Sequence, residues 1–227
     1  MTLPATIVFD LDGTLVDTGP DLTTALNHAL VTLGREPVPE ADVRDMVGSG
    51  ALKLIERGLA RTGGEARELT AAMMPLFLEY YAAHIADLSR PYPGVAAALD
   101  ALLAAECRLA ICTNKNERLA RQLIEALGWA HRFSAILGGD SLPVRKPDPE
   151  HLLATIRAAG GEAHSAAFVG DTHFDTQAGH AAGVPTVAVR FGFSAESVDD
   201  LGADALIAHY DELIPALHAL MEARAVA

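Results

Sequence analysis

Cysteine, aromatic residues and positive charge are all scarce in this chain. Its 227 residues include two cysteines and 5% aromatic residues, and 17 basic side chains stand against 30 acidic ones, which gives a formal charge of −13. So acidic a chain argues against nucleic acid and anionic membranes as partners. An anionic ligand would therefore need positive charge that is supplied locally, by a few lysines, backbone N–H groups or a metal ion.

The two cysteines do not indicate a disulfide or a metal pair. Cys107 and Cys112 lie five residues apart on one predicted strand, so their side chains should point to opposite faces, as buried thiols of a reducing compartment. No hydrophobic run reaches transmembrane length, and the first predicted strand begins within a few residues of Met1, which leaves no room for a signal peptide. We therefore expect a cytoplasmic protein with no membrane partner.

What the chain does contain is an alternation of helices with short, continuously apolar strands. The predicted strands are residues 7–9, 109–112, 135–137, 166–169, 186–189 and, more weakly, 205–207. Helical runs lie between them, for example at 117–127 and 150–159. This pattern is typical of a parallel sheet that is covered on both faces. The predicted fold class is α/β, a doubly wound, mostly parallel and Rossmann-like sheet.

A long section after the first strand has helical periodicity and almost no strand character. Apolar residues recur at helical spacing over residues 22–33, 43–59 and about 65–87. Pro75 lies inside the third run and predicts a kink or a break there. Because the first strand needs partners from the second half, we predict a catalytic core of residues 1–16 plus 89–227, with residues 17–88 as an inserted α-helical cap.

Polar residues gather where the predicted strands end. Asp10-Leu11-Asp12-Gly13-Thr14 follows the first strand, Thr113-Asn114-Lys115 the second, and Gly170-Asp171 through Asp175 a later one, while Lys146 lies in the loop after residues 135–137. In open α/β sheets, ligands bind beyond the carboxyl ends of the strands. The sequence therefore predicts one site that combines four carboxylates with two lysines.

Each of these motifs also has a purely structural interpretation. An aspartate–glycine pair after a strand is a common turn, and Thr113 with Asn114 could cap a helix. Asp171 and Asp175 could stabilise a helix N-terminus. For Asp148, which precedes a proline and a glutamate, we prefer the helix-cap interpretation. The convergence of the other residues on one edge of the sheet favours a functional site.

Crowded carboxylates limit what such a site can be. Four of them repel one another unless positive charge compensates, and a hard divalent cation such as Mg²⁺ together with a lysine would supply it. In extended backbone, residues two apart project to the same side, so Asp10 and Asp12 can both face a substrate, one as nucleophile and the other as proton donor. Gly13 would let the chain turn away behind them. This arrangement suits phosphoryl transfer.

The four motifs, in this order, resemble those of the haloacid dehalogenase superfamily of phosphatases, and the helical insertion resembles the C1 cap of one of its subclasses. The resemblance implies that Asp10 attacks phosphorus to form an aspartyl-phosphate, and that Asp12 protonates the leaving alcohol and then activates water. It also implies phosphate-binding roles for five residues of these motifs, namely Gly13, Thr14, Thr113, Asn114 and Lys146. Thr113 and Lys146 count among the catalytic residues.

A magnesium site and a small substrate are also implied by the resemblance. Asp10, the backbone carbonyl of Asp12 and Asp171 would bind Mg²⁺, and Asp175 would orient Lys146 or a water molecule held by the metal. The segments DLDGTLVDTGPDL, VGSGALKLIERGL, RPYPGV and CTNK look most like those of bacterial phosphoglycolate phosphatases. The expected function is therefore Mg²⁺-dependent hydrolysis of 2-phosphoglycolate to glycolate and phosphate by a monomer or homodimer.

The cap offers one candidate specificity element, and one segment departs from the pattern. The backbone N–H groups at Ser49 and Gly50 could hold a small carboxylate, although a plain helix–helix turn explains the glycine–serine–glycine sequence equally well. Residues 190–193 read Arg-Phe-Gly-Phe where we expect a stretch closer to Thr-Tyr-Gly-Tyr, which would place a cation, Arg190, near the site.

Three alternatives remain at this point. A pyrophosphatase or a small sugar-phosphate phosphatase of the same superfamily would share every core motif and differ in the cap. Dehalogenase chemistry at carbon would need neither a metal nor Asp12. A phospho-accepting receiver module uses similar residues, but it lacks an acid/base group such as Asp12 and a cap that closes over a small phosphorylated metabolite.

Overall fold

A six-stranded sheet forms the centre of the computed structural model, which describes residues 3–64, 67–194 and 197–226. The strand order is β5-β4-β1-β6-β7-β8, and every neighbouring pair is parallel. The strands are β1 (Thr6–Phe9), β4 (Arg108–Cys112), β5 (Ala135–Leu137), β6 (Ala166–Gly170), β7 (Thr186–Val189) and β8 (Ala205–Ile207). All six predicted strands are confirmed.

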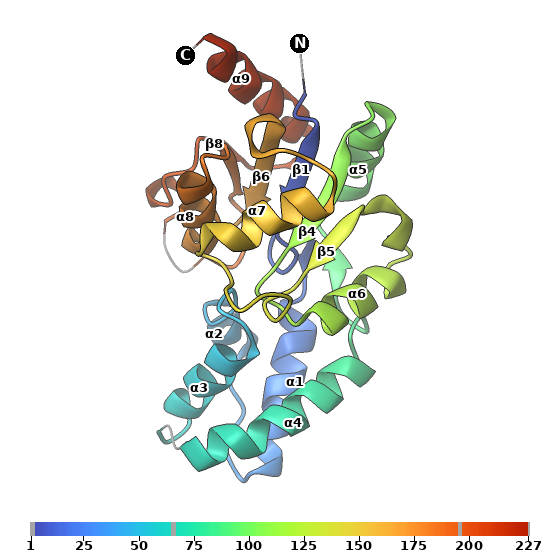
Figure 1. The fold of residues 1–227 in the computed structure, drawn as a ribbon. Coiled ribbons are helices and arrows are strands. Elements are labelled where there is room, and N and C mark those ends of the chain that lie inside the picture. Colours follow the sequence, from blue (N-terminus) through green and yellow to red (C-terminus); the bar gives the residue numbers. More distant parts are fainter. Residues whose placement is uncertain (1–2, 65–66, 195–196, 227) are drawn as a thin grey trace.

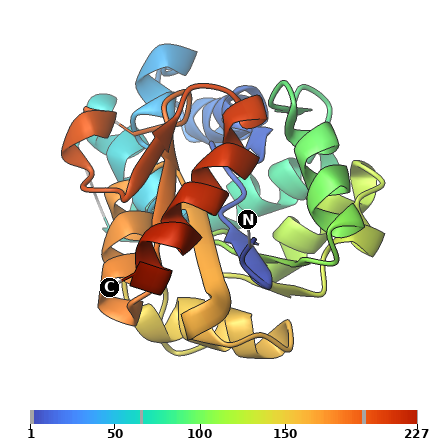
Figure 2. The same cartoon turned by 90° about the horizontal axis from the view of Figure 1, so that it is seen from above.

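Helices cover both faces of this sheet, which confirms the doubly wound architecture (Figure 2). Alternate residues of one strand enter different cores: Ile7 and Phe9 pack into one cluster and Val8 into the other. The helices of this part are α5 (Val95–Ala104), α6 (Glu117–Ala126), α7 (Pro149–Ala158), α8 (His173–Ala182) and α9 (Leu213–Val226). Short 3₁₀ helices occupy Ala130–Arg132, Ala163–Ser165, Val198–Asp200 and Tyr210–Glu212.

The two cysteines divide between the two cores. Cys107 packs into the cluster that holds Ile7, and Cys112 into the one that holds Val8. Both thiols are buried and free, as predicted. Burial raises the pKa of the Cys112 thiol to about 12, so it stays protonated at neutral pH.

The helical insertion lies beneath the carboxyl ends of the strands (Figure 1). It contains α1 (Gly19–Thr32), α2 (Glu40–Arg44), α3 (Ala51–Arg61) and α4 (Arg67–Ala83). The two-residue strands β2 (Val16–Asp17) and β3 (Arg90–Pro91) pair antiparallel where the chain leaves the core and returns to it. The predicted boundaries at 16/17 and 88/89 fall at this pair, although the division into two domains stays a prediction. None of the described helices is long and apolar enough to cross a bilayer.

Pro75 does not break the third helical run, so of the predicted kink or break, the break is wrong. Helix α4 continues through it from Arg67 to Ala83, and residues 65–66, where we expected the run to begin, lie outside those described. Met73, Phe77 and Tyr81 are buried on one face of α4, and α4 packs along α1 and α3. This packing holds the helix together across the one backbone hydrogen bond that proline cannot make.

Candidate active site

The motif residues meet at the carboxyl ends of three adjacent strands. Asp10 follows β1, Thr113 follows β4 and Asp171 follows β6, and β1 lies between the other two. The Asp10 backbone N–H donates to the Val169 carbonyl (2.9 Å), which extends the β1–β6 pairing up to the site. The predicted convergence of these residues on one edge of the sheet is confirmed.

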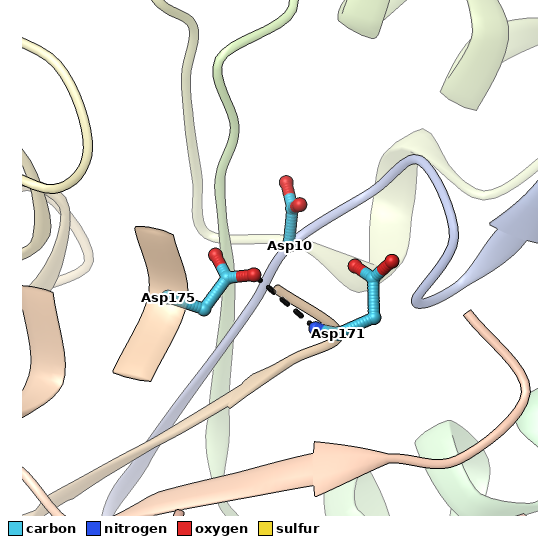
Figure 3. A group of neighbouring side chains, drawn as sticks. All are labelled: Asp10, Asp171 and Asp175. Carbon is cyan, nitrogen blue, oxygen red and sulfur yellow. Dashed lines mark hydrogen bonds between the residues drawn. The ribbon is translucent and has the colours of Figure 1, made fainter. Parts of the chain in front are cut away.

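Three buried aspartates form the centre of the site (Figure 3). Carboxylate oxygens of Asp10, Asp171 and Asp175 all lie within 4.8 Å of one another. Lys146 is the cation among them: its Nζ is 2.9 Å from Asp10 Oδ1 and 2.7 Å from Asp175 Oδ1. The pairing of Asp175 with Lys146 matches one of the two roles that the resemblance implies for it. One ammonium group faces three carboxylates, so the cluster holds an excess of negative charge.

Burial, together with the neighbouring carboxylates, raises the pKa of two of the carboxyl groups. Burial raises the pKa of Asp10 to about 6, against the opposing pull of Lys146. Burial, and then the charges of Asp175 and Asp10, raise the pKa of Asp171 well above its usual range. A divalent cation would remove this penalty, and the donor set consists of the hard oxygen atoms that Mg²⁺ prefers. The residues present therefore fit a metal site.

Asp175 accepts more contacts from protein donors than Asp10 or Asp171 does, so Asp10 and Asp171 are the better candidates for metal ligands. Its Oδ2 accepts from the Asp171 N–H (3.2 Å), the Thr172 N–H (3.0 Å) and the Thr172 hydroxyl (2.8 Å), while its Oδ1 pairs with Lys146. Thr172 and Asp175 also form the capping box of α8. The structural interpretation of Asp175 is thus confirmed, and its functional role stays a prediction that its contact with Lys146 supports.

Asp171 is fixed in a close-fitting seat. Its Oδ1 accepts from the Thr14 hydroxyl (2.8 Å), and its Oδ2 accepts from the Phe193 N–H (2.7 Å). Gly13 has φ +82°, and a Cβ there would lie 2.3 Å from Asp171 Oδ2, so glycine is required twice over. The structure therefore places the Thr14 hydroxyl against Asp171, on the metal side of the site.

Asp12 lies beside Asp10 and is held by groups from two parts of the chain. Both carboxylates line one cavity, as the two-residue spacing predicts. Asp12 Oδ1 accepts from the Thr18 hydroxyl (2.8 Å) and from Lys115 Nζ (2.9 Å). Lys115 Nζ also donates to the Tyr81 hydroxyl (2.7 Å), which comes from α4. No sequence pattern points to Tyr81 as a site residue, because its helical spacing marks it only as a core residue.

The cavity lies between the strand ends and the helical insertion and has a volume of about 40 Å³. The core lines it with Asp10, Asp12, Thr113, Asn114, Lys115 and Leu119, and the insertion with Leu22, Val47, Gly48, Gly50, Ala51, Leu54, Phe77 and Tyr81. A space of this size has room for only a few water molecules. It suits a small ligand.

Thr113 and Asn114 do not cap a helix, because Asn116 caps α6 by accepting from the Leu119 N–H (3.3 Å). The Thr113 hydroxyl accepts from the Lys115 N–H (3.2 Å), so its own hydrogen can be donated into the cavity. The Asn114 side-chain amide donates to the Gly48 carbonyl (3.1 Å) and thereby ties the strand end to the insertion.

Other sequence-based expectations have mixed outcomes. Gly50 lines the cavity, whereas Ser49 lines a neighbouring cleft together with Arg57. Asp148 caps α7 by accepting from the Glu150 N–H, as expected. The expectation of a cation near the site is wrong for Arg190, whose exposed side chain pairs with Asp199 at the surface (2.6 Å). The turn that follows Arg190 instead carries Phe193 inward.

A parallel sheet with a buried acidic cluster and a paired lysine at its strand ends, closed by helices, defines a hydrolase of the capped α/β type. Residues 7–189 match the family model described as haloacid dehalogenase-like hydrolase. The chain therefore belongs to this family.

Several related proteins are similar to this chain over nearly its whole length. A phosphoglycolate phosphatase of Mesorhizobium japonicum is 47% identical over 211 residues, which cover 91% of this chain and 92% of that protein. One of Caulobacter vibrioides is 45% identical over 204 residues, covering 89% and 86% respectively. The crystal structure of a predicted phosphoglycolate phosphatase from Haemophilus somnus matches with a TM-score of 0.89 at 31% identity, covering 95% of this chain and 98% of its own.

Proposed function

We propose that this protein is a Mg²⁺-dependent phosphate monoester hydrolase that converts 2-phosphoglycolate into glycolate and phosphate. The observation that carries the proposal is the agreement of two findings: full-length similarity to phosphoglycolate phosphatases, and a buried acidic site whose cavity suits a small substrate. We place the enzyme in the cytoplasm, where its two free thiols would stay reduced. The prediction of a monomer or homodimer stays a prediction.

In the first half-reaction, an oxygen of the Asp10 carboxylate attacks the phosphorus atom. The bond from phosphorus to the ester oxygen breaks, and Asp12 gives its proton to the departing glycolate oxygen. Asp12 lines the same cavity as Asp10, which puts a proton donor within reach of the leaving group. The product of this step is an aspartyl-phosphate at Asp10 and free glycolate.

In the second half-reaction, Asp12 accepts a proton from a water molecule that attacks phosphorus. The bond between phosphorus and Asp10 breaks, which regenerates the carboxylate and releases phosphate. The Thr113 hydroxyl and the Asn114 backbone would donate to the phosphoryl oxygens, and Lys146 balances charge on the nucleophile and the phosphoryl group. Closure of the insertion excludes bulk water except the reacting molecule.

Asp10, the Asp12 backbone carbonyl and Asp171 would hold the Mg²⁺ ion. Bound there, the ion would supply positive charge to the phosphoryl oxygens and to the nucleophile. Thr14 and the Phe193 N–H keep Asp171 aimed at this position, and Asp175 keeps Lys146 in place. Gly50 contributes backbone to the cavity wall, where its N–H would approach the substrate. Ser49 would act through its backbone, as the resemblance of this segment suggests, since the residue lines the neighbouring cleft and not this cavity.

The test is phosphate release from 2-phosphoglycolate, pyrophosphate and a panel of small sugar phosphates, with Mg²⁺ and with EDTA, by the wild type and Asp10→Asn. We expect Mg²⁺-dependent turnover that is selective for 2-phosphoglycolate and absent from the variant. Preferred turnover of pyrophosphate or a sugar phosphate would overturn the substrate and keep the mechanism. A lasting phosphate label on Asp10 without turnover would overturn the enzyme assignment in favour of a phospho-accepting signalling module.

A further inference from the structure

The central cavity contains a single cation among the residues that the structure assigns to its lining. That cation is Lys115, which lies in the loop after β4, whereas the acidic side chains of the lining are Asp10 and Asp12. Lys146 approaches Asp10 from within the buried cluster and is committed to Asp10 and Asp175. Lys115 is therefore the one cationic side chain of this lining that can face a second negative group on a substrate besides its phosphate.

Lys115 is held at a junction of the core and the helical insertion. Its Nζ lies 2.9 Å and 3.1 Å from the two carboxylate oxygens of Asp12, and 2.7 Å from the Tyr81 hydroxyl. The ammonium group also lies 4.5 Å from the centre of the Tyr81 ring. Tyr81 is 1% exposed and Lys115 is 7% exposed, so this contact is sealed from bulk solvent.

Hydrogen-bond accounting leaves one free donor at this junction, next to the positive charge of Lys115. An ammonium group has three hydrogens, and the contacts of Lys115 with the two Asp12 oxygens and the Tyr81 hydroxyl account for all three. The Tyr81 hydroxyl accepts from Lys115, so its own hydrogen is free to be donated. Both residues line the cavity, so a carboxylate there can accept from the Tyr81 hydroxyl and draw one ammonium hydrogen of Lys115 away from its two-point contact with Asp12.

The position of Lys115 next to Asp12 suits a substrate whose carboxylate is close to the ester oxygen. Under the proposed function, Asp12 protonates that oxygen, and Lys115 touches Asp12 directly. A group separated from the ester oxygen by a single methylene therefore falls next to Lys115. A longer or uncharged leaving group would either miss these two groups or bury the Tyr81 hydroxyl hydrogen without an acceptor, which is costly.

We propose that Lys115 and Tyr81 together bind the carboxylate of the substrate and so select phosphate esters of short 2-hydroxy acids. Because Lys115 comes from the core and Tyr81 from the insertion, this carboxylate site is complete only when the two lie together as in the structure. The inference rests on the proposed function, and it assigns selectivity to side chains of the cavity in addition to the backbone at Gly50.

The test is a selectivity ratio: kcat/KM for 2-phosphoglycolate divided by kcat/KM for ethyl phosphate, which has the same carbon count and no carboxylate. We expect the ratio to fall about 10-fold in Tyr81→Phe and about 100-fold in Lys115→Met, because one neutral and one charged hydrogen bond to the carboxylate are lost. Lys115→Arg should recover part of the loss. Tyr80→Phe is the matched control, since Tyr80 lies on the same helix, stacked between two histidines and outside the cavity lining.

The wild-type ratio separates failure of this inference from failure of the proposed function. A wild type that does not favour 2-phosphoglycolate over ethyl phosphate overturns the proposed function, and this inference with it. A wild type that favours it, with a ratio unchanged in Tyr81→Phe and Lys115→Met, overturns this inference alone: equal losses on both substrates would mean that the pair only positions Asp12. Should Lys115→Met fail to fold, Tyr81→Phe, which removes one hydroxyl, decides.

Discussion

Replacing Asp10 with asparagine should stabilise the metal-free protein although it abolishes the proposed nucleophile. Burial holds the pKa of Asp10 at about 6, above the ordinary 3.8. At about 1.4 kcal/mol per pH unit, an ionised Asp10 costs the folded state about 3 kcal/mol at pH 7.5. Asparagine has the same shape and no charge, so Asp10→Asn should recover up to that amount. In a chain of this size, about 3 kcal/mol corresponds to an increase in Tm of about 6–12 °C.

The pH dependence of this gain follows from the sign of the shift. A carboxyl group whose pKa is higher in the folded state favours folding when it is protonated, so the wild type loses this stability as the pH rises from about 4 through about 6. The advantage of Asp10→Asn should therefore be largest above pH 7, fall to about half at pH 5, and vanish once Asp10 is protonated in both states.

Thermal unfolding in EDTA at pH 5.0 and 7.5, followed by circular dichroism, measures the effect. The matched control is Asp175→Asn, another buried aspartate of the cluster, which should lower the Tm because its carboxylate satisfies Lys146 and three donors of residues 171 and 172. If Asp10→Asn melts at or below the wild-type temperature at pH 7.5 without metal, Asp10 is not electrostatically strained and the reasoning is refuted.

Two further substitutions probe the seat of the metal ligand and the junction of the insertion. Gly13→Ala should lower activity at least 100-fold and weaken the dependence on Mg²⁺. Residue 13 has φ +82°, and a Cβ there would lie only 2.3 Å from Asp171 Oδ2, so the Asp171 carboxylate would have to move. An unchanged Mg²⁺ titration would contradict this. Asp21→Asn should destabilise the protein by about 1–3 kcal/mol in chemical denaturation, because Asp21 accepts from the Ser89 N–H (2.7 Å) and hydroxyl (2.6 Å), and an amide NH₂ cannot accept. The control is Asp42→Asn, because Asp42 pairs with Arg61 at the surface; it should change the free energy of unfolding by less than about 1 kcal/mol. An equal effect of Asp21→Asn and Asp42→Asn would count against the buried contact of Asp21.

The features that could be predicted from sequence are those set by local pattern. Short apolar runs and helical periodicity locate strands and helices, because burial on both sheet faces needs continuous hydrophobic strands. The carboxyl ends of parallel strands share one edge, so Asp10, Thr113 and Asp171 could be brought together without coordinates. Even the conformation of Gly13 follows from its place behind two carboxylates.

The features that escaped prediction depend on contacts between distant segments. Tyr81 contacts Lys115 across 34 positions, and the helical spacing around Tyr81 is the same whether its hydroxyl meets a cavity or a carbonyl. Arg190 was misplaced for a related reason, since its direction is set by Asp199 and not by its position after a strand. Pro75 was overestimated as a helix breaker, because tertiary packing outweighed local propensity.

The same electrostatic penalty that destabilises the metal-free site should contribute to metal affinity. Ionised Asp10 costs about 3 kcal/mol when only Lys146 offsets it, and a cation that relieves this cost gains the same amount, a factor of about 100 in its dissociation constant. A second lysine beside Asp171 would stabilise the empty protein and weaken the metal by neutralising its ligands. The shortage of positive charge within the cluster is therefore consistent with a site built to be completed by an ion. The other lysine of the site, Lys115, lies outside the cluster and pairs with Asp12.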